Sequence, residues 1–176
     1  MINKKINDAF NQQINKEIFS SYLYLSMATY FDSQGMAGFS HWFRLQAQEE
    51  MFHAMKFYHH IVERGGRVLL HAIKEPEKKW DSTLKAFEAA LKHEQYISTC
   101  INDLMDLTMK EKDYASRSLL QWFVDEQVEE EASVGEIIDK LNLAGEKGQM
   151  LYMIDRELSG RQSGANPFDS TQQEAD

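Results

Sequence analysis

The chain has 176 residues, enough for one domain with a substantial buried core, and 43% of them are hydrophobic, which excludes a wholly disordered protein. Its formal net charge is −9, which argues against a general nucleic-acid-binding protein and suits a cationic partner. The one cysteine, Cys100, cannot form an intrachain disulfide, and no apolar run reaches membrane-spanning length. We therefore expect a cytoplasmic protein that binds neither nucleic acid nor membranes.

Long segments between the few glycines and prolines carry apolar residues at helical spacing. This spacing predicts four long helices, and a short fifth helix is expected near the C-terminus. The third predicted helix has Asp81 as its N-cap. The expected helices cover about residues 4–32, 37–64, 82–110, 114–143 and 148–160.

The lengths of the links between these helices predict their topology, because short links join antiparallel neighbours. The first link and the third are short, but residues 65–80 could extend over roughly 50 Å, and a helix of about 28 residues is only about 42 Å long. This segment can therefore cross the whole bundle. We expect an all-α, up-down-down-up four-helix bundle with a long crossover between helices 2 and 3 and a short fifth C-terminal helix.

The bundle with its fifth helix is expected to form one domain, residues 1–161, followed by a flexible C-terminal tail, residues 162–176. The crossover is too apolar to be a free linker. Its hydrophobic side chains should pack on the flank of the bundle or against another copy of the chain, and they are Val68, Leu69, Leu70 and Ile73.

Each long helix also carries a polar side chain near its midpoint, on the face that is otherwise apolar. At about 100° per residue, Glu50 falls in the middle of the apolar stripe of its helix, and His53 lies about 60° from it. The same count places a polar group on each of the other stripes: Glu17, Glu94, and Gln127 with Glu130 on its flank. One such glutamate often reaches solvent, but agreement among all four helices points to a shared site.

Several buried carboxylates at one level need a cation among them, since a lone buried carboxylate is costly. No basic residue lies beside them on these stripes, so the available countercharge is a metal. Oxygen ligands with a single imidazole suit iron or manganese. Di-iron carboxylate bundles use one Glu from each of two helices and Glu-x-x-His from each of the other two.

Here the second of those motifs reads Gln-x-x-Glu, which makes the two metal positions unequal. One metal would be held by Glu17, Glu50 and His53, and the second more weakly by Glu50, Glu94 and Glu130. An asymmetric, partly open second position favours metal turnover over a permanent cofactor.

At these residues the sequence resembles haem-free bacterial and archaeal ferritins, through the stretches "NKEIFSSYLYLSMA", "AQEEMFHAMKF", "HEQ" and "LQWFVDEQVEEE". The resemblance spans nearly the whole chain. It implies iron storage and detoxification by a hollow shell of 24 subunits without haem. Each subunit would be a ferroxidase that oxidises Fe(II) with dioxygen or hydrogen peroxide, and the ferric product would be deposited as mineral inside the shell.

The resemblance also assigns roles to individual residues. Glu17, Glu50 and His53 would bind the first iron, with Glu50 bridging to the second. Glu94 would bind the second iron, with Glu130 reaching it and Gln127 nearby. A third iron site would be formed by Glu49, Glu126, Glu129 and Glu130. Tyr24 would be a hydrogen-bonding or electron-donating residue beside the centre.

Other readings of the sequence stay open. Met51 follows Glu50, where bacterioferritins place a haem-binding methionine, although Gln127-x-x-Glu130 departs from the bacterioferritin motif. Rubrerythrin-like oxidases also need the second Glu-x-x-His, and mini-ferritins would lack the fifth helix. From a different class, a metal-free structural bundle would have the same crossover but no reason to align its glutamates.

Overall fold

The structure, a computed structural model, describes residues 1–145 and 148–162. Within these ranges the chain is helical and has no strand. The helices are α1 (Lys4–Ser33), α2 (Ala37–Glu63), α3 (Thr83–Lys110), α4 (Tyr114–Ala144) and α5 (Gly148–Leu158).

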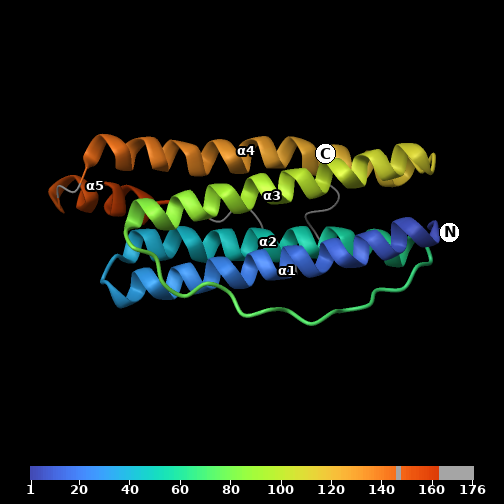
Figure 1. Cartoon of the computed structure of the whole chain (residues 1–176), viewed down its shortest axis with the longest axis horizontal. Helices are drawn as coiled ribbons and strands as arrows, with labels where there is room; N and C mark the ends of the chain where they lie inside the picture. The colour runs from blue at the N-terminus through green and yellow to red at the C-terminus, as the bar shows by residue number, and fades with distance from the viewer. Residues whose placement is uncertain (146–147, 163–176) are drawn as a thin grey trace.

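The helices form the predicted up-down-down-up bundle (Figure 1). Helix α1 packs antiparallel to α2, α3 packs antiparallel to α4, and the crossover between α2 and α3 returns along the length of the bundle. The predicted helix bounds agree with the observed ones to within two residues. The predicted tail, residues 162–176, lies outside the described residues except for Gln162. No helix of the described part is long and apolar enough to cross a membrane.

Local sequence signals explain where the helices begin and end. Gly35 and Gly65 end α1 and α2 with φ of +72° and +68°, a region that glycine enters without steric cost. The cap of α3 is Ser82, whose Oγ accepts the N–H of Lys85 at 3.2 Å. The prediction of Asp81 as this cap was therefore wrong by one residue, because serine and aspartate are equally good capping residues.

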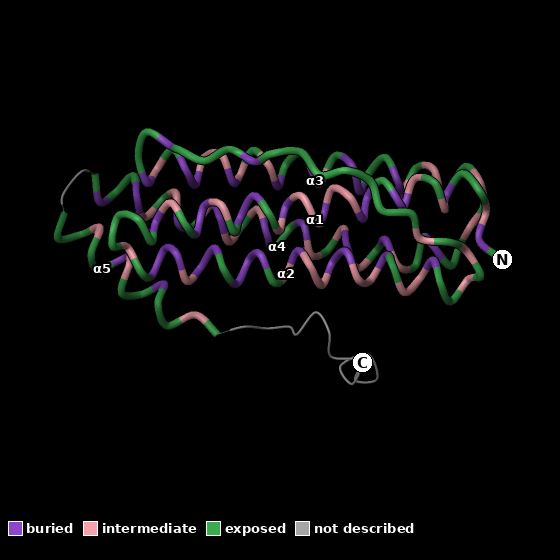
Figure 2. Tube along the Cα trace, turned by 90° about the horizontal axis from the view of Figure 1, so that it is seen from below, coloured by how far each residue is buried: buried purple, intermediate pink, exposed green. Residues whose placement is uncertain are grey.

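The inward faces of the four long helices are buried along their whole length (Figure 2). The hydrophobic core is nevertheless divided into two clusters. One includes Phe31, Phe43 and Phe87, and the other includes Phe10 and Phe57. Between them lies a layer of buried polar side chains: Glu17, Ser20, Gln46, Glu50, His53, Glu94, Gln127 and Glu130.

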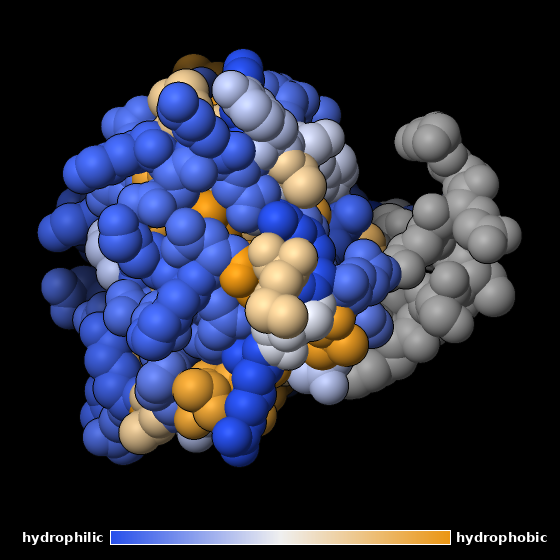
Figure 3. Space-filling view, turned by 90° about the vertical axis from the view of Figure 1, so that its right-hand side faces the viewer, coloured by the Kyte–Doolittle hydropathy of each residue, from blue (hydrophilic) through white to orange (hydrophobic). Residues whose placement is uncertain are grey.

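The crossover is tethered to α1 by side chains rather than buried by it. Asn11 donates to the carbonyl of Arg67 at 3.0 Å and accepts the N–H of Leu69 at 2.7 Å. Val68 is partly buried against the core, but Leu70 is 72% exposed and Ile73 is 42% exposed on the single chain. Of the two predicted ways to bury them, the flank of the bundle therefore does not suffice. The end of the bundle where α1 begins has a different surface: hydrophobic groups there are scattered among hydrophilic ones (Figure 3).

Helix α5 is fixed to the beginning of α2. Asp155 accepts the backbone N–H groups of Gly38 and Phe39 at 2.8 and 2.9 Å, so this α5 side chain caps α2. Ile154 and Leu158 of α5 are buried in the first of the two core clusters. A Cβ atom on Gly38 would lie 1.6 Å from the carbonyl oxygen of Asp155, so only glycine permits this close approach.

Gly38→Ala is accordingly expected to displace α5 and to lower the free energy of unfolding by at least about 2 kcal/mol, as overpacking does. Gly135→Ala on α4 is the control, because a Cβ there meets nothing within 4 Å and should stabilise its helix by about 0.5–1 kcal/mol. Calorimetry compares the two variants with the wild type. Equal stability of all three proteins would contradict the close docking of α5.

Candidate metal centre

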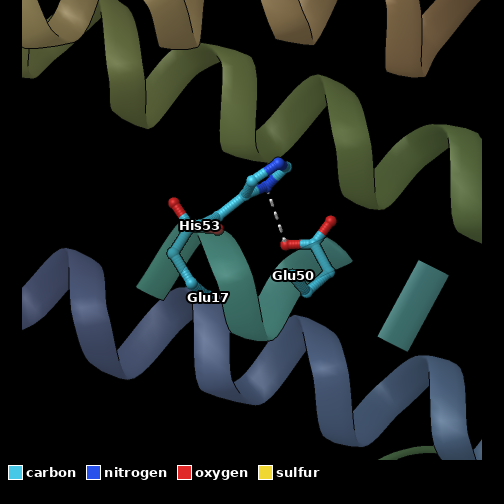
Figure 4. A group of neighbouring side chains, drawn as sticks. All are labelled: Glu17, Glu50 and His53. Carbon is cyan, nitrogen blue, oxygen red and sulfur yellow. Dashed lines mark ion pairs between the residues drawn. The ribbon is translucent and has the colours of Figure 1, made fainter. Parts of the chain in front are cut away.

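Three buried side chains converge in the polar layer between the two core clusters. Glu17 projects from α1, and Glu50 and His53 project from α2, where spacing of three residues places them on one face. One ligand atom from each of the three lies within 4.8 Å of the others. Figure 4 shows Glu50 and His53 pointing toward one another, and Nδ1 of His53 lies 3.7 Å from a Glu50 oxygen. The predicted first metal position is therefore a compact group of side chains.

Three of the four carboxylate oxygens of this group accept no hydrogen bond from the described residues. Gln13 donates to one oxygen of Glu17 at 2.8 Å. The other Glu17 oxygen and both Glu50 oxygens accept no hydrogen bond from any described residue. Buried acceptors without donors are costly, and a cation bound between them would satisfy all three. The donor set, oxygen with one imidazole, fits iron. A metal-free structural bundle would offer no reason for this arrangement.

The pKa values of the carboxyl groups show the same need for a cation. Burial raises the pKa of Glu50 well above its usual value, and the nearby charges of Glu94, Glu17 and Glu130 raise it further. Burial also raises the pKa of Glu17. Both shifts favour the neutral form of these carboxyl groups in the empty centre, and a metal ion bound between them would favour the ionised form instead.

A second group shares His53 with the first. Glu126 and Glu130 of α4 approach the imidazole so that one ligand atom of each residue lies within 4.8 Å of the others. The amide of Gln46 donates to a Glu130 oxygen at 2.6 Å. Burial, together with the charge of Glu94, raises the pKa of Glu130 to about 7.

Glu94 lies in the same layer but belongs to neither group. The hydroxyl of Tyr24 donates to one oxygen of its carboxylate, and the amide of Gln127 donates to the other at 3.2 Å. Gln127 also donates to the backbone carbonyl of Glu94, at 3.2 Å. Burial raises the pKa of Glu94 to about 7 and that of Tyr24 well above its ordinary value. Tyr24 is therefore a neutral phenol that orients Glu94.

The residues of the predicted third site are only partly brought together. Glu126 and Glu130 lie in the second group, but Glu49 forms an ion pair with Arg161 at 2.9 Å, and Glu129 is exposed. Glu49 lies on α2 beside the second group. Burial raises the pKa of Glu49, the charges of Arg161 and His53 lower it, and the charge of Glu126 raises it; the net pKa is raised.

Sequence reasoning missed Gln13, Gln46 and Arg161, which contact three of the candidate glutamates. Gln13 and Gln46 each precede a candidate ligand by one helical turn, so the periodicity that revealed Glu17 and Glu50 could have revealed them as well. No sequence signal could have linked Arg161 to Glu49. Trp122 of α4 packs its ring edge-on against His53, with the ring centroids 5.5 Å apart.

Comparison with known proteins agrees with this geometry. The family described as "Ferritin-like domain" matches residues 7–144. The chain is 42% identical to proteins named bacterial non-heme ferritin from Staphylococcus saprophyticus, over 92% of this chain and 96% of that protein, and from Bacteroides fragilis, over 92% of this chain and all of that protein. The solved open-pore ferritin of Archaeoglobus fulgidus is 53% identical and superimposes with a TM-score of 0.91, covering 92% of this chain and all of that one.

Proposed function

Because the chain belongs to the ferritin family, we propose that it stores and detoxifies iron by oxidising Fe(II) at the buried centre and retaining the ferric product. The observation that carries the proposal is the Glu17–Glu50–His53 group, in which three of the four buried carboxylate oxygens accept no hydrogen bond from the described residues. Iron is the substrate of this site rather than a permanent cofactor. The relatives named non-heme ferritins support a protein that works without haem.

In the proposed reaction, Fe(II) first binds Glu17, Glu50 and His53. A second Fe(II) binds between Glu50, Glu94 and Glu130, once the Glu94 carboxylate turns from Tyr24 and Gln127 toward the centre. Two Fe(II) ions give up two electrons, which with two protons reduce dioxygen to hydrogen peroxide, or reduce hydrogen peroxide to water. The negative carboxylates favour this step because they stabilise the higher charge of Fe(III).

The second group, with its acidic residues, would bind ferric iron that leaves the first two positions. We propose that a third iron binds beside the first two, between Glu126, Glu130 and Glu49, with Glu129 at the surface beyond them. Sharing of His53 between the two groups supports transfer over a short distance. Tyr24 and Gln127 would act by holding Glu94 in place before iron binds and by releasing it afterwards.

We propose that the protein assembles into a homo-oligomer, a hollow shell of 24 subunits in the cytoplasm. Exposed apolar side chains of the crossover, Leu69, Leu70 and Ile73, support burial against another copy. The net charge of −9 suits a container for cations and supports no role with nucleic acid.

Stopped-flow absorbance of ferric product, after mixing metal-free protein with Fe(II) and dioxygen, tests the proposal. The protein should oxidise iron much faster than buffer does, and size-exclusion chromatography should recover the iron with a particle many times the 20.5 kDa mass of one chain. Oxidation at the rate of buffer, or iron that elutes apart from the protein, would contradict the proposal.

A further inference from the structure

Arg161 is a basic side chain that reaches the acidic centre from outside the four-helix bundle. Its guanidinium donates to Glu49 at 2.9 Å and to the side-chain oxygen of Gln46. It also lies over the ring of Trp42, 5.1 Å from the centroid. Trp42, Gln46 and Glu49 follow one another at helical spacing on α2, so a single face of this helix receives the guanidinium.

The backbone around Arg161 is held in place as well. Its carbonyl oxygen lies 2.8 Å from Nε2 of His41, and its N–H donates to the carbonyl of Leu158 at the end of α5. Helix α5 is itself fixed by the contact of Asp155 with the beginning of α2. The side chain of Arg161 is only 26% exposed, and that of Glu49 is 16% exposed. This ion pair is therefore partly buried and held in a fixed geometry, unlike a solvent-exposed surface pair.

Arg161 also determines the orientation of the Gln46 amide. A guanidinium can only donate hydrogen bonds, so the oxygen of the amide must face Arg161 and its nitrogen must face away. That nitrogen donates to a Glu130 oxygen at 2.6 Å, and Gln46 itself is fully buried. One arginine thus contacts Glu49 directly and Glu130 through a single amide.

We propose that Arg161 is an internal countercation that keeps the third iron site weak, so that iron leaves that site readily. It neutralises Glu49, and through Gln46 it engages one of the Glu130 oxygens that a cation would use. A cation entering between Glu49, Glu126 and Glu130 has to displace the guanidinium or tolerate its charge. Arg161 is a positioning residue, and this inference rests on the proposed function.

Calorimetric titration of the metal-free protein with Zn²⁺, which has no redox chemistry, tests the inference without measuring activity. Arg161→Gln should tighten the weakest site of the centre by about tenfold, because it removes a positive charge that repels a cation at that site. The two tighter sites should be unchanged. Arg161→Lys keeps the charge and should restore the weak binding.

Arg156→Gln is the matched control, because it removes the same charge from an exposed position of α5. It should leave all Zn²⁺ affinities at the wild-type values. A weakest site that is unchanged or weaker in Arg161→Gln overturns the inference alone. A wild-type protein that binds no Zn²⁺ at the centre overturns the proposed function, and the inference with it.

Discussion

Glu50→Ala is expected to slow Fe(II) oxidation by at least roughly 100-fold, because loss of a residue that only supports a metal ligand already costs 10- to 100-fold. Glu50 lies between both proposed iron positions and provides two buried oxygens that accept no hydrogen bond within the described chain. Its removal would therefore affect both iron ions at once. Stopped-flow absorbance gives the rate for the variant and the wild type.

The fold should survive this substitution. Metal-free Glu50 is a desolvated carboxyl surrounded by other carboxyls, with a raised pKa, so its loss relieves a cost rather than removing a stabilising contact. The assembled mass should equal that of the wild type. Glu63→Ala, at an exposed position of the same helix, is the control and should oxidise iron at the wild-type rate. A Glu50→Ala protein that keeps the wild-type rate would contradict the assignment.

The metal-free protein is expected to become less stable as the pH rises from about 4.5 to about 7. Burial is the main cause that raises the pKa of both Glu94 and Glu130 from 4.5 to about 7 in the folded chain. Below pH 4.5 both groups are protonated in the folded and unfolded states, so they cost nothing. Above pH 7 both are ionised in the fold, and each lowers the free energy of unfolding by up to about 3 kcal/mol.

The variant Glu94→Gln with Glu130→Gln isolates this effect from the titration of surface groups. Calorimetry with a chelator present, at about pH 5.5 and about pH 8, should show a larger loss of stability in the wild type than in the double variant. Saturating Zn²⁺ should remove the difference, because a bound cation stabilises the ionised carboxylates. If stability depended on pH identically in the two proteins, the result would contradict raised pKa values at Glu94 and Glu130.

Much of the fold could be predicted because its signals are local. Stripes of apolar residues, glycines with positive φ and one link long enough to cross the bundle determine the helices and their order. The misplaced cap of α3 reflects two adjacent residues, Asp81 and Ser82, of nearly equal capping ability. The exposure of Leu70 could not be predicted, since the sequence does not say whether the bundle or another copy covers it.

The candidate centre, like the fold, could be predicted from the sequence only in part. Glu17, Glu50 and His53 could be placed together because Glu17 and Glu50 lie mid-stripe on their helices and His53 follows Glu50 by three residues, and helical spacing fixes where such side chains point. The hydrogen bonds of Glu94 to Tyr24 and Gln127 depend on rotamers, which spacing does not determine. The pairing of Glu49 with Arg161 joins residues 112 positions apart, and it exists only because α5 docks against α2.

Anomalous diffraction at the iron absorption edge, from crystals loaded with Fe(II) without oxygen, tests the central claim most directly. The structure predicts an iron peak within bonding distance of Glu17, Glu50 and His53, with weaker peaks toward Glu94 and toward Glu126 and Glu130. Saturated crystals with iron peaks only on the outer surface, and none among Glu17, Glu50 and His53, would contradict it.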